Sequence, residues 1–238
     1  MNSSMKNIIM VAFIFLLIVS CTPAAERSVA VKTAPAEMPV AQPIQPAQQM
    51  SAEVKSLIDK TKEITNYMYF FDASEVGSYE VWRKDNLVKK VYSEPVKLGK
   101  ESYYNEVYLD MDKGTAIGIC TDAGVLCSPV WKKSFVLDYN RELPAVDPVT
   151  LVEQVSYAEK VGTERVETRA TTIIREDSTD KKVKLWLDDY YGFPLREVVY
   201  KVVGDQEVVL EKHTFSKVQV GQVKTADVTM PTGYTAAE

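Results

Sequence analysis

Residues 184–200 read KLWLDDYYGFPLREVVY, two apolar runs separated by a polar turn. Asp188 and Asp189 can accept hydrogen bonds from backbone amides of the turn, and Gly192 can adopt a positive φ. Pro194 has no N–H to donate to a sheet, so it suits the start of the returning strand. The segment therefore predicts an antiparallel β-hairpin.

Most of the chain around this hairpin has the two-residue period of short strands. Turn signals separate the periodic runs, among them Asp85-Asn86 and Lys113-Gly114. This spacing is typical of an antiparallel meander. The expected strands are, in chain order, Tyr67–Phe71, Ser78–Arg83, Leu87–Ser93, Tyr103–Asp110, Thr115–Cys120, Val130–Leu137, Gly162–Arg175, Lys182–Asp188, Leu195–Val203 and Glu207–Val220.

Two segments instead have the three- and four-residue period of an amphipathic helix. The first begins at Ser51, a residue type that caps helices, and has Glu53 in its first turn. The second is expected from Asp147 to about Val161, because Pro148 suits a first helical turn and an apolar stripe follows. Each helix needs an apolar surface to pack against, since alone it would be marginal in water.

The returning strand of the hairpin is apolar on both faces. Leu195, Val199 and Val203 point to one side, and Val198, Tyr200 and Val202 point to the other. A sheet with one face in water would alternate apolar and polar residues more regularly. Two helices can cover only part of one face, so we expect an α+β domain, residues 51–238, with a curved antiparallel sheet wrapped over helices or over a cavity.

The hairpin resembles one found in the lipoprotein carriers LolA and LolB and the RseB-like sensors. In that family a strand ending in Trp-hydrophobic-Asp leads into a turn, a proline and a returning strand, and Trp186, Asp188, Gly192 and Pro194 hold those places. The closing Met230–Tyr234 is similar to the family's final Pro-x-Gly-aromatic segment, and Glu207–Val220 fits its penultimate strand.

This resemblance implies an unclosed β-barrel, a strongly curved antiparallel sheet covered by two or more helices that enclose a hydrophobic cavity. Members of the family use the cavity to shield acyl chains of lipoproteins or other lipids. The pair Cys120 and Cys127 and the Pro-rich segment near the N-terminus are not part of the family pattern and indicate a distant branch.

The chain begins with the layout of an export signal. Lys6 precedes an apolar run from Ile8 to Val19, and Cys21 follows shortly after. The run is too short for a comfortable transmembrane helix, which needs about 20 apolar residues. A cysteine at the cleavage position resembles a lipoprotein signal, in which the thiol receives a diacylglyceryl group. We expect a signal peptide over residues 1–20 and a lipid on Cys21; a plain signal peptide or an uncleaved anchor is the alternative.

Residues 21–50 are rich in Ala, Pro and Gln. The repeated prolines exclude a helix, so we expect a disordered stalk between the lipid and the domain. The protein should then be attached to the cell membrane or outer membrane, with its domain facing outside the cytoplasm. With 33 Asp and Glu against 28 Lys and Arg, the chain is not suited to nucleic acid and has no polybasic patch for anionic lipid.

If Cys21 is acylated, Cys120 and Cys127 remain as a pair. A turn signal lies between them, so a hairpin could place the two sulfurs at bonding distance. Outside the cytoplasm such a pair should oxidise, and closing so small a loop stabilises a fold by roughly 2–3 kcal/mol. A metal site would need more ligands, and a redox dithiol usually has Cys-x-x-Cys spacing. We therefore expect a structural disulfide.

Signals of catalysis are missing from the sequence. It has no phosphate-binding glycine motif and no Gly-x-Ser-x-Gly. His213 is the only histidine, and nothing near it supports a catalytic triad. Acidic pairs such as Asp188-Asp189 flank turns, where capping and solubility explain them better than calcium binding or acid–base catalysis. We expect a protein that is not an enzyme and that uses no cofactor and no metal.

Aromatic residues are the remaining signal, because an apolar ligand pocket is lined by such side chains with few polar groups. Plain core packing explains each of them better when it is taken alone, and the two-sided apolar strands favour the pocket only for the group as a whole. The candidates for an apolar cavity wall are Tyr69, Phe71, Tyr79, Trp82, Tyr104, Tyr108, Trp186 and Tyr200.

Two functions follow from these observations. The first is a lipid-anchored binding protein that holds an acyl chain, a lipid or a lipoprotein in a hydrophobic cavity. The second is a structural or sensor lipoprotein of the envelope whose curved sheet binds another protein and carries no lipid. An empty apolar volume on the concave side of the sheet would favour the first, and a cavity filled by the protein's own side chains would favour the second.

Overall fold

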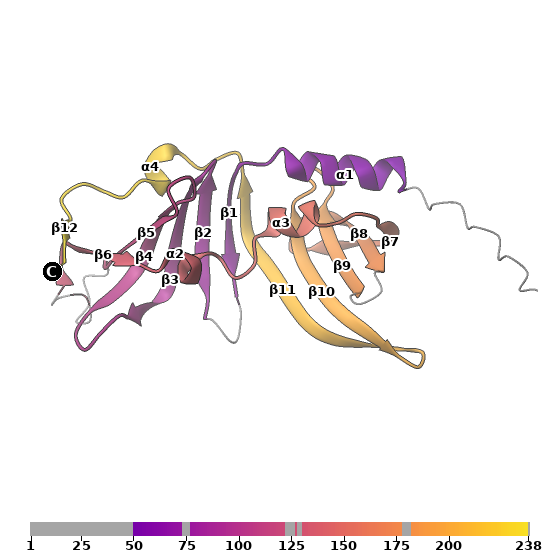
Figure 1. Cartoon of the computed structure of the whole chain (residues 1–238). Coiled ribbons are helices and arrows are strands. Elements are labelled where there is room, and N and C mark those ends of the chain that lie inside the picture. The colour runs from indigo at the N-terminus through magenta and orange to yellow at the C-terminus, as the bar shows by residue number, and fades with distance from the viewer. Residues whose placement is uncertain (1–49, 73–76, 122–126, 128–129, 178–181, 238) are drawn as a thin grey trace, which may run out of the picture. The chain divides into compact units, whose positions relative to one another are not determined.

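The computed structural model describes residues 50–237 except 73–76, 122–126, 128–129 and 178–181. Within these residues, twelve strands form one sheet in the order β12-β6-β5-β4-β3-β2-β1-β11-β10-β9-β8-β7 (Figure 1). β12 and β7 stand at opposite ends of this order, so the curved sheet does not close. The strands are β1 (Asn66–Phe71), β2 (Tyr79–Lys84), β3 (Leu87–Lys97), β4 (Tyr103–Asp110), β5 (Thr115–Ile119), β6 (Lys133–Leu137), β7 (Glu159–Val166), β8 (Arg169–Asp177), β9 (Lys182–Asp188), β10 (Pro194–Val203), β11 (Gln206–Val220) and β12 (Thr235–Ala236).

Four short helices accompany this sheet in the described residues: α1 (Ala52–Lys62), α2 (Tyr139–Glu142), α3 (Pro148–Glu153) and α4 (Thr225–Val228). α1 begins where the sequence predicted, because the Ser51 side chain accepts a hydrogen bond from the backbone N–H of Val54 at 3.3 Å. The fold is therefore α+β with an unclosed, mostly antiparallel sheet, and among the described strands only β12 and β6 pair in parallel.

The meander was predicted closely, and the hairpin of residues 184–200 most closely. β9 and β4 have the predicted bounds, and β10 and β11 each begin one residue early. The turn between β9 and β10 also has the predicted chemistry: the Asp188 carboxylate accepts hydrogen bonds from the backbone N–H groups of Tyr190 and Tyr191. Gly192 has a φ of +76°.

The region between the two halves of the sheet differs from the prediction. The expected helix from Asp147 to Val161 is wrong in length, because α3 ends at Glu153 and β7 takes up the following residues. The expected strand Gly162–Arg175 is instead two strands, β7 and β8, joined at Glu167, whose φ is +54°. No glycine or proline marks that turn, so the pattern of the sequence did not reveal it.

The face on which α1 and α3 pack is here called the helix face. Val54, Leu57 and Ile58 of α1 and Val152 of α3 meet apolar residues of β8 and β9 in one buried cluster. The opposite face is called the outer face. There α4 packs beside β2 and β3, and Met68, Val223 and Val228 form a small buried cluster.

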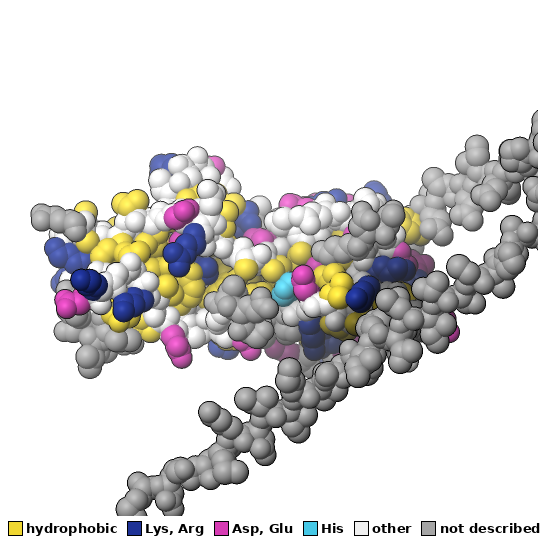
Figure 2. Space-filling model, turned by 60° about the horizontal axis from the view of Figure 1, so that its bottom comes forward, with side chains coloured by type: hydrophobic (Ala, Val, Ile, Leu, Met, Phe, Trp, Pro, Cys, Tyr) yellow, Lys and Arg dark blue, Asp and Glu magenta, His cyan; other side chains and the backbone are white. Residues whose placement is uncertain are grey.

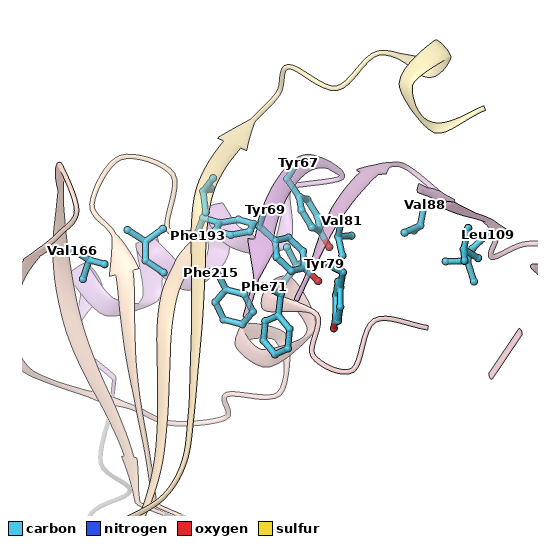
Figure 3. Packing of buried hydrophobic residues seen from close by; sticks show 14 of the residues in the cluster. Tyr67, Tyr69, Phe71, Tyr79, Val81, Val88, Leu109, Val166, Phe193 and Phe215 are labelled. Carbon is cyan, nitrogen blue, oxygen red and sulfur yellow. The ribbon is translucent and has the colours of Figure 1, made fainter. Parts of the chain in front are cut away.

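Over β1 to β4 the helix face carries an aromatic core. Tyr67, Tyr69 and Phe71 alternate along β1, and the rings of Phe193 and Phe215 lie against them at centroid distances of 5.3 to 5.7 Å. Figure 3 shows Tyr69, Phe71, Tyr79 and Phe215 gathered between β11, β1 and β2. The cover here is the connector, defined as residues 138–147, which includes α2 and leads into α3.

The expected apolar surface on both faces of β10 is present, but its far end is not covered by any described residue. Leu195 and Tyr200 are buried on opposite sides of the strand, whereas Val202 and Val203 are 46% and 56% exposed. Here the β10–β11 hairpin extends beyond the neighbouring strands (Figure 1). Helices therefore cover only part of the sheet. The prediction that two or more helices cover it agrees only loosely with the structure.

Gly192 provides a direct test of how the N-terminal helix is attached to this hairpin. Its carbonyl accepts a hydrogen bond of 2.7 Å from the Thr61 hydroxyl, and a Cβ at this position would lie 2.3 Å from the Leu57 carbonyl oxygen. We predict that Gly192→Ala lowers the free energy of unfolding by about 3 kcal/mol, from clash and positive φ together.

The matched control for this variant is Gly204→Ala. Gly204 also has a positive φ, but nothing lies within 4 Å of a Cβ there, so the loss should be only about 1 kcal/mol. Denaturant unfolding of both variants measures the difference. Equal losses would show that the close approach of α1 contributes nothing.

Candidate binding site

The connector is attached to the helix face at two points, and the first is Asp147. One oxygen of its carboxylate accepts hydrogen bonds from the Tyr67 hydroxyl at 2.7 Å and the Arg83 guanidinium at 2.9 Å. The other oxygen accepts from the backbone N–H groups of Val149 and Thr150 and so caps α3. A single side chain thus joins β1, β2 and the start of a helix.

The second point of attachment is Glu142, which is only 2% exposed. Its two carboxylate oxygens accept hydrogen bonds from the hydroxyls of Tyr92 and Tyr104 at 2.8 and 2.7 Å. A buried carboxylate is costly unless it is hydrogen-bonded, and these two donors meet that need. Two strands, β3 and β4, therefore hold one residue of α2.

Between these points the tyrosine hydroxyls bond the connector backbone. Tyr69 donates to the carbonyl of Val146 at 2.9 Å, and Tyr79 accepts from the N–H of Ala145 at 3.1 Å. Burial is the main cause that raises the pKa of both phenols, that of Tyr79 to about 12. The tyrosines therefore form a floor whose polar atoms are satisfied by the connector.

Lys90 lies on the same floor, facing Glu142. It is 4% exposed, and its ammonium lies 4.6 and 4.5 Å from the ring centroids of Tyr79 and Tyr92. Its hydrogen bond in the described structure is a long one, 3.4 Å to the carbonyl of Glu142. Burial lowers the pKa of Lys90 to about 8, against the smaller opposing effect of the Glu142 charge.

Three hollows lie along the connector and α3. The largest, of about 610 Å³, is bounded by Arg83, Val88, Met111, Leu143, Pro144, Ala145, Val146, Asp147, Thr150, Leu151, Glu153, Gln154, Glu197, Glu211 and His213. A second of about 310 Å³ lies over Lys90, and a third of about 190 Å³ lies under α3. Ligand pockets are typically 300–1,000 Å³, so the first two are large enough for a small molecule or part of a lipid.

The lining of the largest hollow combines apolar side chains with paired charges. Arg83 is bonded to Asp147, and the Nδ1 atom of His213 lies 2.7 Å from the buried carboxylate of Glu197. Figure 2 shows the one histidine, in cyan, at this surface beside apolar side chains. His213 is half-buried and lines the hollow, a position that no pattern in its neighbouring residues predicts.

The eight aromatic candidates do not form one group. Four of them, Tyr69, Phe71, Tyr79 and Tyr104, lie on the helix face, in a buried cluster that also includes Trp186. Strand alternation places the other four on the outer face: Trp82 packs beside α4, Tyr108 pairs with Lys89, Trp186 with Arg196 and Tyr200 with Lys182. A wall on the helix face can therefore include only the first four, and three of those use their hydroxyls to hold the connector.

Cys120 and Cys127 are joined in a disulfide, with their Cα atoms 5.5 Å apart. Both are fully buried beside Val130 and Phe135, in the connection between β5 and β6. Most of the turn between them lies outside the described residues, as do Cys21, the expected signal peptide and almost all of the expected stalk.

Two further observations concern the described residues only. They contain no group of three or more His, Cys, Asp or Glu side chains placed to hold a metal ion. None of their helices is both long and apolar enough to span a bilayer.

No family model matches the chain, and no curated protein sequence matches it. Solved structures do. The MucA/MucB complex of Pseudomonas aeruginosa matches with a TM-score of 0.41 at 16% identity, over 75% of this chain and 60% of that one. LprF of Mycobacterium bovis matches with 0.41 at 14%, over 77% and 99%.

A LolA superfamily protein of Nitrosomonas europaea matches with a TM-score of 0.28 at 12% identity, over 76% of this chain and 99% of that one. These likenesses concern the fold alone. The chain spans about 60% of the length of the MucB-containing chains it matches.

The buried ammonium of Lys90 makes stability depend on pH. Its pKa is about 8 in the folded protein and 10.5 ordinarily, so between these values the unfolded chain binds the proton that the folded protein has released. We predict that the free energy of unfolding rises from pH 8 to about 9.5, by about 1–2 kcal/mol. Above pH 10 it should fall, because the buried tyrosines stay protonated while those of the unfolded chain ionise.

The variant Lys90→Met removes the titrating group and keeps the aliphatic stem. Denaturant unfolding at intervals between pH 7 and 11 should show no rise below pH 10 for this variant. A rise of the same size in both proteins would assign the effect to another group.

Proposed function

We propose that this chain is a lipid-anchored, extracytoplasmic binding protein that is not an enzyme and that holds the apolar chain of a lipid or lipoprotein on the helix face of its sheet. The observation that carries the proposal is the hollow of about 610 Å³ between the connector, α3 and the sheet. The anchor is the expected lipid on Cys21. No cofactor is needed, because holding and releasing a ligand requires only a difference in affinity between donor and acceptor.

The lining of the hollow suits an amphiphile better than a wholly apolar molecule. Val88, Leu143, Val146 and Leu151 offer apolar surface, and Met111 lies at the end of β4. Arg83 is paired with Asp147 and His213 with Glu197, so a hydrocarbon chain would not leave these groups without hydrogen-bond partners. Glu153 and Glu211 are exposed to water. The lining of the hollow includes residues of β2, β3, β10 and β11 as well as the connector and α3, so a chain-like ligand would contact several strands.

A second candidate function is the binding of another protein, and one observation favours it. The far end of the β10–β11 hairpin exposes a patch of apolar residues, Val202, Val203, Val208, Val209 and Leu210. Exposed apolar surface of this kind often marks an interaction site. A sensor or scaffold could use it without any lipid.

Extraction distinguishes the two functions. A chain beginning at Pro46, where the compact unit begins, is purified without detergent and its organic extract is analysed by mass spectrometry. We predict a bound lipid in stoichiometric amount. A lipid-free protein that also ignores fluorescent fatty-acid probes would leave the second function as the better one.

Filling the hollow should remove the lipid. Ala145 lines the two larger hollows, so Ala145→Phe places a ring in the space that the chain would occupy. We predict at least a fivefold loss of co-purified lipid. Val136→Phe is the matched control, because Val136 is 88% exposed and lies on β6, away from the hollow. Equal lipid in both variants would place the ligand elsewhere.

The anchor has its own test. Cells grown with labelled palmitate should incorporate the label into the full chain and not into Cys21→Ala. Label that persists in the variant would show that Cys21 is not the site of acylation, without bearing on what the domain binds.

A further inference from the structure

The second hollow, of about 310 Å³, contains a lysine whose N–H donors are not all hydrogen-bonded. An ammonium has three N–H groups, and in the described part of the chain Lys90 uses one, in the long bond to the carbonyl of Glu142. The rings of Tyr79 and Tyr92 attract its charge but offer no ordinary acceptor. A buried ammonium is costly when its donors are unmet, so this arrangement lacks an acceptor.

Glu142 does not supply that acceptor with its carboxylate. Both of its oxygens accept hydrogen bonds from tyrosine hydroxyls, and the described structure has no ion pair between Glu142 and Lys90. Their charges still attract each other, since Glu142 counteracts the effect of burial on the Lys90 pKa. The carboxylate belongs to the attachment of the connector, and the ammonium remains directed at the hollow.

The walls of this hollow define the size and charge of a ligand. It measures about 310 Å³, and its lining comprises Tyr79, Lys90, Tyr92, Val96, Tyr104, Arg141, Glu142, Leu143 and Ala145. Arg141 is exposed and has no ion pair among the described residues, so it can stand at the mouth. Lys90 and Arg141 together outweigh Glu142 by one positive charge. One negative charge on a ligand would balance them.

We propose that this hollow is a binding site for a small organic monocarboxylate, whose carboxylate bonds the Lys90 ammonium and whose apolar body lies among the tyrosine rings and Val96. A phosphate monoester is a poorer fit, because its second charge would have no partner in an aromatic enclosure. The site is separate from the proposed lipid function, although the two hollows share Leu143 and Ala145 at their border.

The test uses phenylacetate and phenylacetamide, which have the same shape and differ in charge. Both are soluble enough to be titrated into the full chain in mild detergent and followed by ligand-observed NMR. We expect phenylacetate to bind at least tenfold more tightly than the amide at pH 7, because a hydrogen bond between two charged groups is lost in the amide.

Two lysine variants identify the group responsible. Lys90→Met should weaken phenylacetate about tenfold and leave the amide unchanged. Lys89→Met is the matched control, because Lys89 is the next residue on β3 but lies over the Trp82 ring on the outer face. It should bind phenylacetate as the natural chain does. Equal affinity for acid and amide, or equal losses in the two variants, would overturn the proposal.

The pH dependence of phenylacetate affinity in the natural chain is a further test, and it does not depend on whether a variant folds. Phenylacetate should bind progressively more weakly from pH 7 to pH 10, as Lys90 loses its proton. The other charged or titratable groups facing the hollow are Glu142, Arg141, Tyr79, Tyr92 and Tyr104. Burial is the main cause that raises the pKa values of the three tyrosines, so these phenols stay protonated in the lower part of this range. Affinity that does not change between pH 7 and 9 would count against Lys90.

The outcome is separable from that of the lipid experiment. Phenylacetate binding that depends on Lys90, in a protein that carries no lipid, would leave this site standing and remove the proposed function. A lipid that co-purifies with a protein indifferent to phenylacetate would do the reverse.

Discussion

The structure depends on satisfying the tyrosine hydroxyls of the helix face. Tyr67, Tyr69, Tyr79, Tyr92 and Tyr104 supply the ring surface that a curved sheet needs for its core, but each also carries a polar atom into a buried place. The connector resolves this conflict, because its backbone and the carboxylates of Glu142 and Asp147 supply the matching bonds. The tyrosine hydroxyls are hydrogen-bonded where the connector packs on them, and the hollows lie where the connector does not cover the sheet completely.

The parts of the fold that could be predicted are those fixed by local chemistry. The turn of residues 188–193 contains its own signals, and the strands β9 to β11 are rich in apolar, β-branched and aromatic residues and are bounded by turn residues. The end of α3 and the turn at Glu167 have no such signals, since they follow from how β7 pairs at the edge of the sheet. α4 and β12 were not predicted for the same reason: their few residues are set by packing on the outer face and on β6.

The candidate site was predicted only in part, because aromatic content does not say on which face of the sheet a side chain lies. Alternation along a strand does assign the face. Lys90 is two residues from Val88 and two from Tyr92, so the sequence of β3 indicates that this lysine lies on the apolar face of the sheet. Asp147 and Glu142 had no comparable signal. Their partners lie on strands 38 to 80 residues earlier in the chain, a pairing that a single sequence does not reveal.

In the middle of the sheet, the first strand of the domain pairs with one of its last strands. β1 pairs with β11, and beside that pair Asn66 exchanges two hydrogen bonds with the backbone of Val223, 157 residues later. Until the last strands have emerged, β1 is an open edge with large rings on it, and pairing over so long a separation is slow. Under the proposed export from the N-terminus, the sheet would stay incomplete throughout the passage, and the first half of the chain would need protection from aggregation until the second half arrives.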